Sequence, residues 1–209
     1  MDRRTVLGAL GGAGVAGLSG YWVFGEHATH GATRTVSLTA QDGIPDRHDI
    51  AITADLIEDT ITSSRTARIR LTIGNTGPER AFSPAGSGRC SPFNRSYGGS
   101  DEPPGLWLHR PEDAEYIDRD GTQWKADRFQ SESRGFAAVA CSPIQYGSGQ
   151  QRSTVYEVWD DYKIDGYLKS GTYRWEQEFE IWNDPDSGVR KSPDAEFTWG
   201  FELQLETAE

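Results

Sequence analysis

Hydrophobic and polar residues alternate through most of the chain after residue 34, and helical periodicity is nearly absent there. The clearest case is the segment 68–73, in which three aliphatic residues alternate with two arginines and a threonine. The segments 50–56, 173–181 and 197–205 repeat the pattern, with Trp, Phe, Tyr and aliphatic residues in the apolar row. Because successive side chains of a strand point to opposite faces, each segment is predicted to be a strand with one buried face.

Shorter strands are predicted around residues 36–38, 106–108, 136–140 and 155–159. Turn signals rich in Asn, Asp, Gly and Pro separate the strands at 75–78, 118–121 and 183–185. Eight or nine strands of this kind favour an all-β fold, an antiparallel immunoglobulin-like β-sandwich, over residues 34–209.

The N-terminus has a different pattern. Arg3 and Arg4 precede a stretch of 20 uncharged residues, 5–24, six of which are Gly. This arrangement resembles a twin-arginine export signal, which implies that the folded domain works outside the cytoplasm. The stretch is also about as long as the roughly 20 residues that span a bilayer, so residues 1–25 are either a cleaved signal or a retained membrane anchor. Residues 26–33 are interpreted as a linker.

The chain is strongly acidic, with 32 Asp and Glu against 21 Lys and Arg, a net charge of -11. The bases are nearly all Arg, since Lys occurs at four positions. This balance resembles that of haloarchaeal proteins, in which molar salt shortens the Debye length to about 3 Å and screens self-repulsion. An ordinary acidic secreted protein is the alternative. The negative charge argues against nucleic acid and anionic lipid surfaces as partners.

Two cysteines, Cys90 and Cys141, are each followed by Ser-Pro. In an exported chain an even count predicts a disulfide, with free thiols and a metal site as the alternatives. The bridge would join two segments with loop composition, 86–105 and 142–151. Aromatic and Arg side chains among Gly and Ser are typical of adaptable contact surfaces, although they could equally pack the loops onto the sandwich. The residues concerned are Phe93, Arg95, Tyr97, Gln145 and Tyr146.

Asn94 opens an Asn-Arg-Ser acceptor sequence for N-glycosylation, which has meaning only if the chain is exported.

The segment Leu168-Lys169-Ser170-Gly171-Thr172-Tyr173 resembles the entry to a late strand of immunoglobulin-like sandwiches. In that motif the Tyr hydroxyl bonds back to an upstream backbone group. A wider resemblance covers residues 49–182. A strand ending in Asn75-Thr76-Gly77, a middle strand at 105–108 and the segment 168–173 follow an order similar to BsuPI-type proteinase-inhibitor domains, which are small immunoglobulin-like sandwiches. The resemblance implies a proteinase inhibitor.

No sequence motif for nucleophilic catalysis, phosphate binding or zinc binding is present. Of four His, His27 and His30 lie in the linker, so a catalytic triad would need His48 or His109. The leading hypothesis is therefore a non-catalytic interaction domain of a halophilic cell surface, without a cofactor, whose partner is a protein or glycan outside the cell. The alternatives are a proteinase inhibitor and an exported hydrolase with a pocket that contains His48 or His109.

Overall fold

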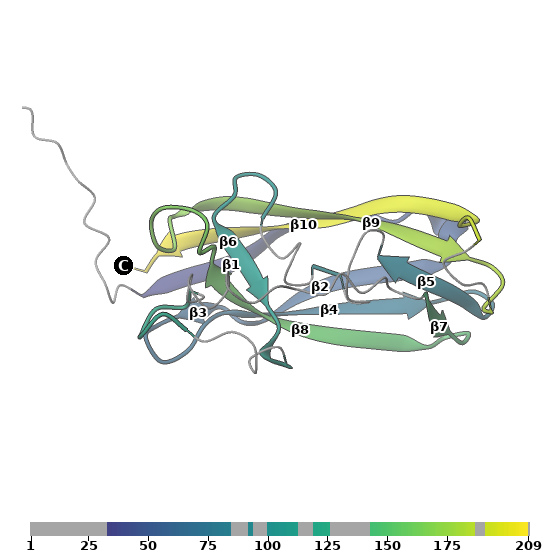
Figure 1. The fold of residues 1–209 in the computed structure, drawn as a ribbon, viewed down its shortest axis with the longest axis horizontal. Helices are drawn as coiled ribbons and strands as arrows, with labels where there is room; N and C mark the ends of the chain where they lie inside the picture. The colour runs from purple at the N-terminus through teal and green to yellow at the C-terminus, as the bar shows by residue number, and fades with distance from the viewer. Residues whose placement is uncertain are drawn as a thin grey trace, which may run out of the picture.

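The computed structural model describes residues 33–84, 92–93, 100–112, 119–125, 143–186 and 191–208. In this part of the chain, ten strands form two antiparallel sheets that pack face to face, which confirms the predicted all-β sandwich (Figure 1). The elements are β1 (Arg34–Gln41), the short 3₁₀ helix η1 (Asp46–His48), β2 (Ile50–Glu58), β3 (Thr60–Ile61), β4 (Arg68–Asn75), β5 (Arg80–Pro84), β6 (Leu106–His109), β7 (Ile144–Tyr146), β8 (Gln151–Asp160), β9 (Gly171–Trp182) and β10 (Ala195–Thr207).

The strand order is that of an immunoglobulin-type sandwich with additions. The six-stranded sheet has the order β3-β1-β10-β9-β5-β7, and the four-stranded sheet has the order β2-β4-β8-β6. If β1, β3 and β7 are set aside, the remaining strands take the letters A to G in chain order. They are β2 (A), β4 (B), β5 (C), β6 (D), β8 (E), β9 (F) and β10 (G). Strands A, B, E and D then form one sheet and C, F and G the other, as in immunoglobulin constant-type domains.

The inner faces of the two sheets are filled by large aromatic side chains. Trp175, Trp199, Phe201 and Tyr156 are at most 1% exposed. The rings of Trp175 on β9 and Phe201 on β10 stack with their centroids 5.2 Å apart. Aromatic pairs in such geometry add about 0.5–1.5 kcal/mol beyond the area that they bury. The alternating rows of the sequence therefore meet as one core.

The predicted contact of the Tyr at the start of a late strand is present. Tyr173, two residues into β9, donates its hydroxyl to the carbonyl of Lys169, 2.7 Å away. The bond closes the corner through which the chain passes from the four-stranded sheet at β8 to the six-stranded sheet at β9. It is the same corner that carries this contact in immunoglobulin-type sandwiches.

Three of the ten strands in the described residues, β3, β5 and β7, were not predicted. The segment 142–151, predicted as a loop, contains β7 and the first residue of β8. β5 was not predicted, because all five of its residues are buried and its sequence does not alternate. The predicted strand at 136–140 lies outside the described residues. In the described part of the chain, no helix has the length and apolarity needed to cross a membrane.

One detail of the four-stranded sheet positions the candidate site. β6 pairs with β8 only from Glu157 to Asp160. On its other side β8 pairs with β4 over seven of its ten residues, from Gln151 to Glu157. Within the described residues, the first half of β8 therefore has an open edge.

Candidate functional site

A tight turn, 147–150, connects β7 in one sheet with β8 in the other. The buried Asn75 at the end of β4 holds this turn from within. Its side-chain nitrogen lies 3.0 Å from the carbonyl oxygen of Tyr146 and 3.2 Å from that of Gly147. Its backbone N–H donates to Gln150, and its carbonyl accepts from Gly149. β7 and β8 therefore leave a fixed corner and diverge into different sheets (Figure 1).

A second set of contacts, made by Arg80 and His48, lies next to this turn. Arg80, 6% exposed, donates from Nη1 to the carbonyl of His48 at 2.7 Å and faces Asp49 at 3.5 Å. The His48 ring stacks on Phe197 with a centroid distance of 5.2 Å. Burial lowers the pKa of His48, and the neighbouring charges of Arg47 and Arg80 act in the same direction. These contacts fix η1 against the β4–β5 connection, next to the turn 147–150.

A pocket of about 180 Å³ opens between the diverging strands. Ile73 from β4, Phe82 from β5 and Ile144 from β7 are among the apolar side chains that line it. Arg152, Ser153 and Thr154 of β8 contribute polar groups to the same lining. The complete lining is Leu71, Ile73, Phe82, Pro84, Pro92, Ile144, Tyr146, Arg152, Ser153 and Thr154.

The pocket exists because the inward-facing side chains of β8 are fully buried in its second half but not in its first half. Val158 and Tyr156 are fully buried, but the next two inward positions are Thr154 and Arg152. Thr154 is small and only partly buried, and Arg152 is exposed. The Tyr156 hydroxyl donates to the carbonyl of Pro92 and fixes one wall.

The side chain of Arg152 reaches from β8 to β7. Its Nη2 donates to the carbonyl of Gln145 at 3.4 Å, and its guanidinium lies over the Tyr146 ring. No carboxylate lies within 4 Å of this guanidinium among the residues that the structure describes. Burial raises the pKa of Tyr146, although the Arg152 charge opposes the shift, so the phenol is a proton donor at neutral pH. The Arg152 cation therefore lies over a ring that is itself buried, since Tyr146 is 3% exposed.

The residues predicted as a recognition surface divide into three groups. Phe93 is 1% exposed and packs edge-on against Phe201, so it belongs to the core rather than to a contact surface. Tyr146 lines the pocket. Gln145 is exposed and donates to the carbonyl of Pro185 at 3.0 Å. The others lie outside the described residues, together with the predicted disulfide and the export signal: Arg95, Tyr97, Asn94, Cys90, Cys141, Arg3 and Arg4.

No family model, curated protein or solved structure matches this chain. The function must therefore be argued from the geometry of the chain itself.

The opposite end of β8 holds an ion pair between Asp160 and Lys125. Asp160 is 4% exposed, and its Oδ2 lies 3.0 Å from Nζ of Lys125. Its Oδ1 accepts the backbone N–H of Leu168 at 2.7 Å, and Lys125 also donates to the carbonyl of Gly166. Both carboxylate oxygens of Asp160 therefore help to hold the β8–β9 connection in place. This role is structural, and Asp160 does not line the pocket.

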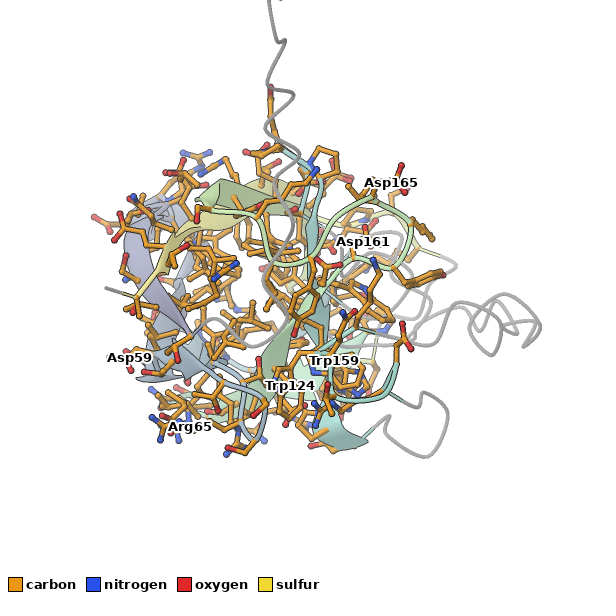
Figure 2. The ribbon with its side chains drawn as sticks, turned by 90° about the vertical axis from the view of Figure 1, so that its left-hand side faces the viewer. Asp59, Arg65, Trp124, Trp159, Asp161 and Asp165 are labelled. Carbon is orange, nitrogen blue, oxygen red and sulfur yellow. The ribbon has the colours of Figure 1, made fainter. Side chains whose placement is uncertain are left out.

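His109 lies at that same end and packs against Trp159 with ring centroids 4.1 Å apart. Figure 2 shows the side chains of Trp124 and Trp159 next to each other there, with Asp161 and Asp165 on the connection after β8. Neither His109 nor His48 lines the pocket. Across the described ranges, no group of three or more His, Cys, Asp or Glu is arranged to hold a metal ion.

Proposed function

We propose that this chain is a non-catalytic interaction domain that works outside the cytoplasm and holds a protein partner by a side chain inserted between β7 and β8. The observation that carries the proposal is the pocket beside the open edge of β8, which is lined by apolar side chains together with Arg152. It lies at a rigid corner, which is where a binding site is best preorganised.

The size of the pocket favours one side chain over a small molecule. Pockets for cofactors and drug-sized ligands enclose about 300–1,000 Å³. A dry cavity of about 150 Å³ holds one benzene ring. The volume of about 180 Å³ therefore suits a single Phe, Leu or Met side chain. Such buried anchors supply most of the binding energy in protein interfaces.

The two alternatives from the sequence have different support. A hydrolase would need His48 or His109 beside carboxylates in a pocket, and the described pocket contains neither histidine. A proteinase inhibitor would need an extended, exposed loop. The two long connections that could supply one lie largely outside the described residues, so inhibition stays a prediction from the resemblance.

A library of random peptides selected on the folded domain tests the interaction. Thr154→Phe places a ring into the pocket and should abolish the binding of selected peptides. Thr53→Phe adds the same ring at an exposed position of β2 that does not line the pocket, and should leave binding unchanged. Equal binding by both variants would contradict the proposal, provided that both retain the thermal unfolding midpoint of a folded domain.

Mass spectrometry of the native protein from its own cells tests the location. We expect a protein outside the cytoplasm with a disulfide between Cys90 and Cys141, and the same spectrum reports the mature N-terminus and any glycan on Asn94. Recovery from the cytoplasm with both thiols reduced would contradict the proposal.

A further inference from the structure

The open edge of β8 presents backbone groups in a defined register. The N–H of Val158 donates to the carbonyl of Ala67, on the β4 side, and the N–H of Asp161 donates to Gly105, on the β6 side. Because backbone groups of successive residues in a strand point to opposite edges, those of Ser153 and Val155 point to the β6 side. β6 does not reach them. An added strand could therefore pair with Ser153 and Val155.

The same geometry determines where the side chains of an added strand would go. Thr154 and Arg152 face the space between the sheets and line the pocket. Residues of an added strand directly opposite them would form non-hydrogen-bonded pairs, in which side chains approach most closely. The side chain opposite Thr154 would enter the pocket, and the side chain two residues along would meet the guanidinium of Arg152.

We infer that the partner is an extended peptide segment that joins the four-stranded sheet beside Ser153–Val155, with an apolar residue in the pocket and an Asp or Glu two residues later. This inference rests on the proposed function and specifies its ligand. Strand addition supplies affinity through main-chain hydrogen bonds, and pockets for alternate side chains supply specificity. The Arg152 guanidinium, which has no ion-pair partner among the described residues, supplies the preference for an acid.

The order of the two residues follows from strand direction. Every strand pair in the two sheets is antiparallel, and β6, whose line the added strand would continue, also runs antiparallel to β8. In an antiparallel partner, the residue opposite Thr154 precedes the residue opposite Arg152 by two positions. The ligand motif is therefore apolar-x-acidic, and the reverse order belongs to a parallel strand.

Synthetic peptides with blocked termini test the motif directly. The test peptide carries Phe-Thr-Glu within a run of Thr and Val, and its binding is measured by fluorescence anisotropy in dilute and in molar salt. The controls carry Phe-Thr-Lys, Ala-Thr-Glu or Glu-Thr-Phe in the same run. We expect each control to bind at least about tenfold more weakly, which corresponds to the loss of one favourable anchor or charge contact.

A charge reversal in the protein separates recognition from misfolding. Arg152→Glu should lose the Phe-Thr-Glu peptide and gain the Phe-Thr-Lys peptide, a change of preference that an unfolded variant cannot show. Hydrogen exchange supplies an independent measure of strand addition. The amides of Ser153 and Val155 should exchange rapidly in the free protein and slow by at least about tenfold when the peptide is bound.

The outcomes distinguish this inference from the function on which it rests. If library peptides bind in a manner that Thr154→Phe abolishes, but neither the acid nor its order matters, the proposed function stands and the inference is wrong. Slow exchange of both amides in the free protein would show that another segment of this chain already pairs there, which also overturns the inference. If no peptide binds, the proposed function fails as well.

Discussion

The guanidinium carbon of Arg152 lies 5.2 Å from the centroid of the Tyr146 ring, and the two residues belong to strands in different sheets. A cation over a ring at an exposed site contributes about 0.5–1 kcal/mol. The contact therefore links the two sheets at their open edge while it leaves most of the guanidinium for a ligand.

We predict that Arg152→Ala lowers the free energy of unfolding by about 0.5–1 kcal/mol, because both the cation–π contact and the hydrogen bond to Gln145 are lost. Arg152→Lys should retain part of this stability, since an ammonium also interacts with the ring. Urea denaturation measures both values. An unchanged midpoint for Arg152→Ala would show that the contact with Tyr146 does not contribute to stability.

The hydrogen bond between the Tyr173 hydroxyl and the Lys169 carbonyl should contribute to stability. Tyr173→Phe removes the hydroxyl that bonds to the Lys169 carbonyl and keeps the buried ring. The free energy of unfolding should fall by about 1 kcal/mol, the usual net value of such a bond. Tyr162→Phe is the matched control, because the Tyr162 hydroxyl makes no hydrogen bond within the described residues while its ring packs on Trp107. Equal losses in both variants would argue against a role for the corner bond.

Asn75 should be among the most sensitive positions of the domain. Asn75→Ala leaves the carbonyls of Tyr146 and Gly147 without their shared donor. Asn75→Asp keeps the size but directs a carboxylate at the same carbonyls, so it should be at least as harmful. Each change should cost about 1–3 kcal/mol in denaturant unfolding. Both variants should also weaken peptide binding without altering a pocket side chain. Normal affinity in a folded variant would show that the corner does not shape the pocket.

Asp160 should make stability depend on pH. Burial raises its pKa above the ordinary value of 3.8, although the Leu168 N–H and Lys125 act in the opposite direction. The folded state therefore holds the proton more tightly than the unfolded state. This contribution to stability is fully present below pH 3.8 and is lost as pH rises through the higher folded-state pKa.

The test compares Asp160→Asn with the wild type across acidic to neutral pH. The variant lacks this titration, so its free energy of unfolding relative to the wild type should improve as pH rises through that window. Asp165→Asn, at an exposed position of the same connection, serves as the control. A difference between Asp160→Asn and wild type that does not vary with pH, or that changes in the opposite direction, would contradict the prediction.

The strands with one buried face could be predicted from sequence because their alternation is a local property. β2, β4, β9 and β10 all lie where the hydrophobic rows indicate. β5 could not be found in this way, since it is buried on both faces and contains Arg80 and Pro84. β7 has three residues in a segment of loop composition, and its pairing with β5 is a long-range contact.

The candidate site was only partly accessible from sequence. Tyr146 was identified from its loop-like surroundings, whereas Phe93, with the same signal, is a core residue. Arg152 and Thr154 were missed because the predicted strand began at Val155, three residues after Arg152. Extension of the alternating row backwards from Tyr156 would have placed both on the inner face. The pocket itself arises from the divergence of β7 and β8, which no local pattern specifies.

The corner held by Asn75 also limits how the pocket can change size. β7 is attached to the six-stranded sheet by three residue pairs with β5, whereas β8 is paired with β4 by seven residue pairs. Enlargement of the cavity therefore requires β7 to detach from β5 while the other strands of both sheets stay paired, a local unfolding step of low cost compared with global unfolding. Discrimination between a small and a large anchor side chain would then depend on how often this short strand detaches.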